Sequence, residues 1–407
     1  MSVKNKVPEI RFKGFSGEWE EKVLEDICDV RDGTHASPKY QQNGFPLVTS
    51  KNVKNGYINY DDVQYISKID FDEINKRSKV DVNDILIGMI GTIGNIALIR
   101  QTPDFAIKNV ALIKDKNEMD FLYSYYFLQS PITTQQLDDF ASGGTQKFIS
   151  LSNVRSLLIC VPEREEQTAI GNTFQKLDSL INQHQQKHDK LSNIKKAMLE
   201  KMFPKQGETI PEIRFKGFSG EWEEKVLEDI CDVRDGTHAS PKYQQNGFPL
   251  VTSKNVKNGY INYDDVQYIS KIDFDEINKR SKVDVNDILI GMIGTIGNIA
   301  LIRQTPDFAI KNVALIKDKN EMDFLYSYYF LQSPITTQQL DDFASGGTQK
   351  FISLSNVRSL LICVPEREEQ TAIGNYFQKL DALINQHQQQ ITKLTNIKQA
   401  CLNKMFV

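Results

Sequence analysis

The side chains best suited to chemistry in this sequence are polar ones that stand in glycine-rich loops. The segments DGTHASPKY, SKNVKNG, GMIGTIG and SGGTQK place His, Lys, Asn, Gln and Thr beside glycines that permit tight turns. These side chains carry hydrogen-bond donors and acceptors, and a Gly pair followed by Thr, Gln and Lys also suits an anion through backbone N–H groups. The chemistry predicted is recognition through hydrogen bonds.

Each of these segments also has a purely structural interpretation. SKNVKNG is typical of a solvated turn, GMIGTIG of a strand pair with close backbone approach, and SGGTQK of a flexible loop. The aromatic residues of FLYSYYFL are typical of a core. His184 and His387 stand on an apolar helix seam, where polar residues set the register more often than they bind ligands.

Signatures of catalysis are not found in the sequence. No GxxxxGK[ST], HExxH or GxSxG motif occurs, and GMIGTIGN fails the GxGxxG spacing. The chain has no Pro-Pro pair, which the motif of adenine methylases requires. None of the five cysteines forms a C-x-x-C pair, so a zinc site is not expected. We predict neither catalytic nor metal-binding residues.

Composition and charge suggest a cytoplasmic protein. The sparse, odd number of cysteines suits a reducing compartment. The sequence shows no apolar run of signal-peptide length and none near the roughly 18 residues of a membrane span. The net charge of −4 does not suggest a nucleic-acid-binding protein, so contact with DNA would need local positive surface.

The chain carries one domain-sized unit twice. Residues 8–172 recur without change as residues 211–375, a repeat far longer than the roughly 20–50 residues of a solenoid unit. Strands are expected at FPLVTS, NVALIKD and LLICVP and on both sides of the Gly91–Gly94 turn. A helix is expected over residues 119–142, interrupted at Pro131. The predicted fold class is mixed α/β (α+β).

A long helix is expected after each copy. The segment VPEREEQ supplies a proline and first-turn acids, and apolar residues then recur at alternating spacings of four and three. We expect each helix to run for about 30–35 residues and to pack against the other. The helices differ where the domains do not, as in Thr173 against Tyr376 and His188 against Ile391. The predicted seam residues are Phe174, Leu177, Ile181, Leu191, Phe377, Leu380, Ile384 and Leu394.

The order of these motifs resembles a known family. The series DGTHASPKY, NGFPLVTSKNV, DILIGMIGTIGNIAL and SGGTQKFISLSNVRSLLICVPEREEQTAIG, then a long heptad helix, is similar to the specificity (S) subunit of Type I restriction–modification enzymes. The resemblance covers nearly the whole chain, and VP…EEQ…I before the helix is its most telling part. It implies two target recognition domains, residues 1–162 and 205–365, and two antiparallel spacer helices, residues 163–204 and 366–407, in a pseudo-twofold arrangement.

The resemblance implies a subunit without catalysis of its own. Each recognition domain would read one half of a bipartite site in double-stranded DNA. Methylase (M) subunits, two of them, would methylate adenine at N6 from S-adenosylmethionine, and restriction (R) subunits would add ATP-driven translocation and cleavage. S-adenosylmethionine, ATP and Mg are therefore expected on partner subunits, with no cofactor on this chain and no membrane contact.

The identity of the two domains departs from the usual family member, whose domains differ. Antiparallel helices would relate the domains by a pseudo-twofold axis, so one reader would meet the same half-site on opposite strands. We therefore predict an interrupted palindrome, with an unread spacer of about 5–9 base pairs estimated from helix length.

The predicted DNA contacts are the polar residues of the glycine-rich loops. Base edges need paired donors and acceptors, or Lys and Arg for guanine, while phosphates need positive charge. The candidates are His35, Lys39, Tyr40, Ser50, Lys51, Asn52, Lys54, Thr92, Lys108, Asn109, Thr145, Gln146 and Lys147, with His238, Lys242, Tyr243, Ser253, Lys254, Asn255, Lys257, Thr295, Lys311, Asn312, Thr348, Gln349 and Lys350 in the second copy. The alternative function is a protein-interaction scaffold of duplicated domains joined by a coiled coil, without DNA specificity.

Overall fold

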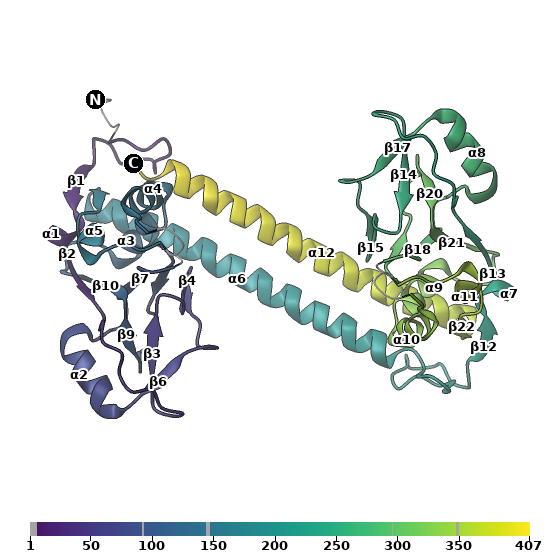
Figure 1. The fold of residues 1–407 in the computed structure, drawn as a ribbon, viewed down its shortest axis with the longest axis horizontal. Helices are drawn as coiled ribbons and strands as arrows, with labels where there is room; N and C mark the ends of the chain where they lie inside the picture. The colour runs from purple at the N-terminus through teal and green to yellow at the C-terminus, as the bar shows by residue number, and fades with distance from the viewer. Residues whose placement is uncertain (1–5, 92, 144–146, 295, 347–349) are drawn as a thin grey trace. The chain divides into compact units, whose positions relative to one another are not determined.

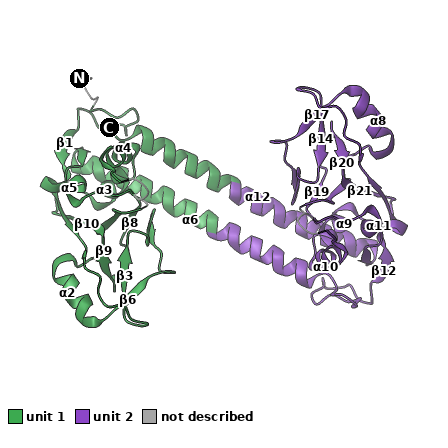
Figure 2. Ribbon diagram, in the orientation of Figure 1, with its two compact units in different colours: residues 1–185, 389–407 green, residues 186–388 purple. Residues whose placement is uncertain are grey.

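The computed structural model describes residues 6–91, 93–143, 147–294, 296–346 and 350–407. The chain forms two compact units, each assembled from separate stretches of sequence: residues 1–185 with 389–407, and residues 186–388 (Figure 2). Each unit therefore combines one globular copy, the first half of the helix that follows it, and the end of the helix that follows the other copy.

Both copies contain the same short strands and helices (Figure 1). The strands of the first copy are β1(Glu20–Val23), β2(Cys28–Asp32), β3(Phe45–Thr49), β4(Val53–Lys54), β5(Tyr57–Ile58), β6(Gln64–Ile66), β7(Ile85–Gly88), β8(Ile96–Leu98), β9(Ala106–Lys108), β10(Val110–Asp115) and β11(Leu158–Val161). Its helices are α1(Leu24–Ile27), α2(Lys68–Ser78), α3(Phe121–Leu128), α4(Pro131–Phe140), α5(Leu151–Arg155) and the long α6(Arg164–Lys201).

The second copy repeats this series. Its strands are β12(Glu223–Val226), β13(Cys231–Asp235), β14(Phe248–Thr252), β15(Val256–Lys257), β16(Tyr260–Ile261), β17(Gln267–Ile269), β18(Ile288–Gly291), β19(Ile299–Leu301), β20(Ala309–Lys311), β21(Val313–Asp318) and β22(Leu361–Val364). Its helices are α7(Leu227–Ile230), α8(Lys271–Ser281), α9(Phe324–Leu331), α10(Pro334–Phe343), α11(Leu354–Arg358) and the long α12(Arg367–Lys404).

The centre of each copy is an antiparallel four-stranded sheet, ordered β2-β10-β7-β8 in the first. Successive side chains of a strand point to opposite faces. Ile85 and Ile87 of β7 accordingly join the core on the helix side, whereas Leu86 joins the core on the other side. Burial on both faces explains why ILIG is a continuous apolar run, and the predicted strands around the Gly91–Gly94 turn are confirmed.

A three-stranded sheet, ordered β6-β3-β9, lies against the second face. In this sheet β3 pairs with β9 in parallel and with β6 antiparallel. Val48 and Ile107 from this sheet share a buried cluster with Leu86 and Leu112 of the larger sheet. The cluster fixes the loops that leave β3, β7 and β9, which hold the predicted recognition residues Ser50, Lys51, Asn52 and Asn109.

Local capping chemistry sets where the short helices begin. The Asp120 carboxylate accepts hydrogen bonds from the N–H groups of Leu122 and Tyr123 at the start of α3. Ser130 caps α4, and Pro131 occupies a first-turn position where no N–H is needed. The predicted helix over residues 119–142 is thus two helices that meet at Pro131, as expected.

The long helices pair antiparallel within each unit. In the first unit the ring centroids of Phe174 and Phe406 stack 5.6 Å apart, and Asp178 binds Lys398 at 2.6 Å. In the second unit Phe377 stacks on Phe203 at 5.8 Å, and Lys195 binds Asp381 at 2.6 Å. Each helix has 38 residues, about 57 Å at 1.5 Å per residue, so the predicted 30–35 residues was too short. The reason is that the helix starts two residues after Pro162 and persists into the opposite domain.

The end of each long helix completes the core of the other copy. Phe406 is 3% exposed and packs against Tyr123, Phe127 and Phe174. Phe203 fills the same position in the second unit. The predicted seam residues are buried or half-buried in both helices. In each unit, the core thus extends onto the adjoining ends of the two long helices.

Candidate nucleic-acid interface

Three loops of each globular copy meet at one serine hydroxyl, and a fourth loop bonds to one of the three. The Ser50 hydroxyl donates to the Asn109 carbonyl at 2.6 Å and accepts from the Met89 and Ile90 N–H groups at 2.9 and 3.2 Å. The Gly91 N–H donates to the carbonyl of Lys147 at 2.9 Å. The structure therefore brings the loops after β3, β7 and β9 together with the loop that carries Lys147.

His35 stands at the edge of this cluster. Its Nδ1 lies 2.8 Å from Oδ1 of Asn109 and its Nε2 lies 2.6 Å from Oδ2 of Asp32. The imidazole side chain is 61% exposed, whereas that of Asp32 is only 6% exposed. Arg77 of α2 binds the other carboxylate oxygen of Asp32. A buried acid thus orients two exposed, nitrogen-rich side chains on one surface.

The predicted lysines and Tyr40 are exposed or half-buried around the same loops. Lys108 donates from Nζ to the Ser37 hydroxyl at 2.7 Å. Lys39, Lys51 and Lys147 are exposed, Tyr40 is 46% exposed, and Lys54 is half-buried. This local group of cations can meet an anionic partner although the whole chain carries net negative charge.

Ser50 and Asn52 lie inside the domain, each 3% exposed. Oδ1 of Asn52 accepts from the Thr49 N–H at 3.0 Å, and its Nδ2 donates to the Asn59 carbonyl at 3.1 Å. Ser253 and Asn255 are buried in the same way. These four side chains support the loops, so we do not retain them as DNA contacts. The predicted contacts Thr92, Thr145, Gln146, Thr295, Thr348 and Gln349 lie outside the described residues.

The second copy reproduces the cluster. His238 lies 2.7 Å from Oδ1 of Asn312 and 2.6 Å from Oδ2 of Asp235, and Ser253 donates to the Asn312 carbonyl at 2.7 Å. A cavity of about 280 Å³ opens beside them, lined also by Phe351. The predicted residues Lys242, Tyr243, Lys254 and Lys350 are exposed, while Lys257 and Lys311 are half-buried.

Sequence reasoning missed two features of this surface. Arg77 and Arg280 join the cluster through Asp32 and Asp235, which lie 45 residues away in sequence. Phe148 is 47% exposed and Phe351 46% exposed, although both are aromatic. An exposed Phe beside a cationic loop is a signal the sequence did contain, because Phe148 directly follows Lys147.

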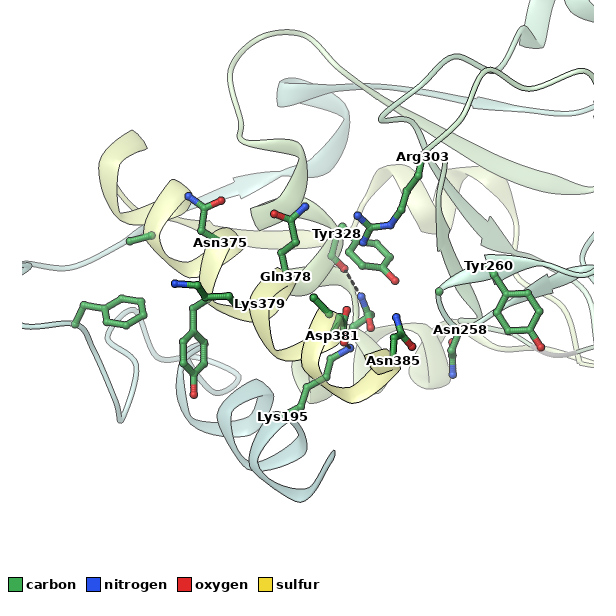
Figure 3. A pocket seen from close by; sticks show the side chains of 16 residues that line it. Lys195, Asn258, Tyr260, Arg303, Tyr328, Asn375, Gln378, Lys379, Asp381 and Asn385 are labelled. Atoms are coloured by element: carbon green, nitrogen blue, oxygen red, sulfur yellow. Dashed lines mark hydrogen bonds and ion pairs between the residues drawn. The ribbon is translucent and has the colours of Figure 1, made fainter. Parts of the chain in front are cut away.

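A larger groove, about 1230 Å³, opens elsewhere in the second unit (Figure 3). One wall is the β15–β16 hairpin with Asn258 and Tyr260, together with Arg303, and the other is the first half of α12. At its base Asp381 accepts from the Tyr329 hydroxyl at 2.8 Å and pairs with Lys195. Burial, and then the nearby Asp381 charge, raise the pKa of Tyr329, which keeps this hydroxyl a donor.

Neither a membrane-spanning helix nor a metal-binding cluster is seen in the part of the chain that the structure describes. None of its helices combines the length and the apolar character needed to cross a membrane. Nor do its His, Cys, Asp and Glu residues gather in threes around a point where a metal ion could bind.

The chain belongs to the family described as the Type I restriction modification DNA specificity domain, whose model matches twice, over residues 16–193 and 219–396. Among its relatives, the putative type I restriction enzyme MjaX specificity subunit and the MjaVIII specificity subunit of Methanocaldococcus jannaschii are each 24% identical. The alignments cover 96% and 95% of this chain and 93% of each relative. The EcoBI specificity subunit of Escherichia coli is 22% identical over 95% of this chain and 85% of its own.

Solved structures share the fold. The S subunit of the Type I restriction–modification system from M. genitalium matches with a TM-score of 0.61 at 18% identity, over 98% of this chain and 99% of its own. A chain from a study of complex assembly and conformational transition of the type I R-M system matches with a TM-score of 0.54 at 17% identity, over 94% and 96%. The predicted resemblance and fold class are confirmed.

Proposed function

We propose that this chain is the DNA-reading subunit of a Type I restriction–modification complex and that its target is an interrupted palindrome. The observation that carries the proposal is the exact recurrence of one polar network in two units. His35 and His238 have equivalent partners at distances that agree within 0.1 Å. Identical readers select identical half-sites, because base readout depends on which donors and acceptors reach the groove.

The antiparallel pairing of helices supports a twofold relation between the readers. Each unit contains one helix running away from its own globular copy and the end of the other helix running towards it. Duplex DNA also has twofold symmetry, so two equivalent readers on antiparallel helices meet the same half-site on opposite strands.

The reading surface is the cluster around the buried serine. We assign contact with double-stranded DNA to the members that are exposed or half-buried, His35, Lys39, Tyr40, Lys51, Lys54, Lys108, Asn109 and Lys147, and to their counterparts in the second copy. The chain supplies recognition, and methylase subunits carry S-adenosylmethionine and methylate adenine at N6. Restriction subunits, with ATP and Mg, act on the same complex, in the cytoplasm.

The test is the methylome of a host without other methylases that expresses this chain with its cognate methylase subunit. We expect one motif, two identical half-sites in opposite orientation around an unread spacer, with N6-methyladenine on both strands. Two unrelated half-sites would refute the twofold argument and leave the recognition role. No motif, with the subunits shown to associate, would favour the scaffold function instead.

The duplicated sequence offers a matched comparison in the same assay. Lys51→Ala changes the first reader and Lys254→Ala changes the second, at equivalent exposed positions. Each variant should relax one half of the motif, and the two variants should give the same relaxed motif, because a palindrome read from either end is the same. If either single variant altered both half-sites, the two domains would not read DNA independently.

A further inference from the structure

We propose that the groove of the second unit between the β15–β16 hairpin and helix α12 holds the sugar-phosphate backbone of the bound DNA, outside the bases that are read. The inference rests on the proposed DNA-reading function and adds a second contact surface to it. That surface includes α12 as well as the globular copy (Figure 3).

The charge of the groove is the first argument. Arg303 and Lys379 line it, and within the described residues neither side chain has a hydrogen bond or ion pair that would neutralise it. The one acid in the lining, Asp381, is already bound by Lys195 at 2.6 Å and by the Tyr329 hydroxyl. The groove therefore presents two uncompensated positive charges in a chain whose net charge is −4.

The neutral residues of the lining suit the same ligand. Asn258, Gln332, Asn375, Gln378 and Asn385 bring amide donors to both walls. Arg, Lys, Asn, Gln and Tyr side chains are the usual donors to DNA phosphates and sugars. Tyr260, which is 59% exposed, adds a hydroxyl on the hairpin wall.

The hairpin wall of the groove adjoins a predicted DNA contact along the chain. Lys257 is the last residue of β15, and Asn258 and Gly259 form the turn that follows it. The hairpin thus carries a predicted DNA contact on its strand and groove-lining residues at its turn. A duplex that contacts Lys257 is therefore one residue along the chain from the lining residue Asn258.

The divergence of the helices favours backbone contact over base readout. Tyr376 and Ala382 line the groove, whereas the equivalent residues of the first copy are Thr173 and Ser179. A base-reading surface must be the same in both copies if the target is a palindrome. Backbone contacts carry no direct sequence information, so they tolerate this difference.

The experiment measures DNA affinity against salt concentration for the full chain with its methylase subunits. The probes are a duplex with the methylated motif and a duplex of equal length with both half-sites scrambled. Arg303→Gln and Lys379→Gln should each weaken binding to both duplexes by the same factor. Each should also reduce the slope of log affinity against log salt by about 0.9 for every phosphate that the protein no longer neutralises.

Two control variants sharpen the result. Arg303→Lys keeps the charge and should keep most of the slope, whereas Lys279→Gln removes an exposed charge on α8, outside the groove, and should change neither duplex. An unchanged slope in Arg303→Gln and Lys379→Gln would overturn the proposal. A loss of affinity for the motif duplex alone would also overturn it, because that result marks a base contact. A loss of methylase association without a loss of DNA affinity would overturn it as well. The wild-type chain could bind both duplexes equally while the two Gln variants still reduce the salt slope. That result would refute sequence reading and leave the groove proposal standing.

Discussion

At the scale of single residues, the most telling motif of the sequence turns out to be an anchor. Glu166 is 1% exposed and accepts two hydrogen bonds of 2.7 Å from Arg11. Gln167 accepts from the Asp120 N–H at 2.8 Å and donates to the Pro162 carbonyl at 2.9 Å. The EEQ acids suit a helix start, and in addition they tie the long helix to its domain.

One helical turn further along α6, close packing against α3 also holds the long helix to its domain. A Cβ added to Gly171 would lie 2.7 Å from Cβ of Leu122, so α6 approaches α3 too closely for any other residue. The glycine in QTAIG is therefore required by contact between helices, because its own backbone is helical and unstrained.

The proposed recognition loops of the second copy depend on Ser253 as those of the first depend on Ser50. Ser253→Ala removes the acceptor for the buried Met292 and Ile293 N–H groups and the donor to the Asn312 carbonyl. We expect a decrease of about 1–3 kcal/mol in unfolding free energy, because buried polar groups are left unpaired. Chemical denaturation measures it, with Ser355→Ala on the surface of α11 as the control. If Ser253→Ala were as stable as Ser355→Ala, the hydrogen bonds of Ser253 would not stabilise the domain.

At the scale of elements, the long helices act as parts of the cores. The first half of α6 belongs to its own unit and the end of α12 completes that unit, with Phe406 among Tyr123, Phe127 and Phe174. Burial of aromatic residues at helix ends supplies far more stabilisation than half-buried seam residues in the middle. The helix ends are therefore where pairing is decided.

Phe406→Ala should loosen the first unit and leave the second unchanged. The expected cost is about 3–5 kcal/mol for a buried Phe→Ala change. The globular copies give identical peptides, so hydrogen exchange must be followed in helix peptides that contain Thr173 or Tyr376, which differ in mass. Exchange should rise in the Thr173 peptide for Phe406→Ala and in the Tyr376 peptide for Phe203→Ala. If either variant raised exchange equally in both peptides, each helix end would not complete the core of the other copy alone.

At the scale of the whole molecule, one half of the chain contains every residue type that the pairing uses. Phe203 and Lys195 in the first half correspond to Phe406 and Lys398 in the second. A second copy of residues 1–206 would thus supply the buried Phe and the Lys that the other half of the chain now supplies.

Residues 1–206 alone should therefore form a homodimer that reads the same palindrome with the methylase subunit. Analytical ultracentrifugation gives the mass, and the methylome gives the motif. Phe203→Ala in the half chain should abolish the dimer, whereas Lys76→Ala on the exposed face of α2 should not affect it. A folded, monomeric half would show that the diverged helix residues are needed for pairing.

The sequence by itself determined the repeat, the mixed fold, the family, the starts of α3, α4 and the two long helices, and the loops in which recognition residues are proposed. These follow from composition, periodicity and capping within a few residues, as in Asp120 before α3 or Pro131 at α4. Only the tertiary structure decided that Ser50 and Asn52 are buried, that Arg77 reaches Asp32, and which helix end fills which core. The Arg77–Asp32 pair joins residues 45 positions apart, and the contacts of Phe406 join residues more than 200 positions apart. No local pattern encodes which distant surfaces meet when apolar faces are buried.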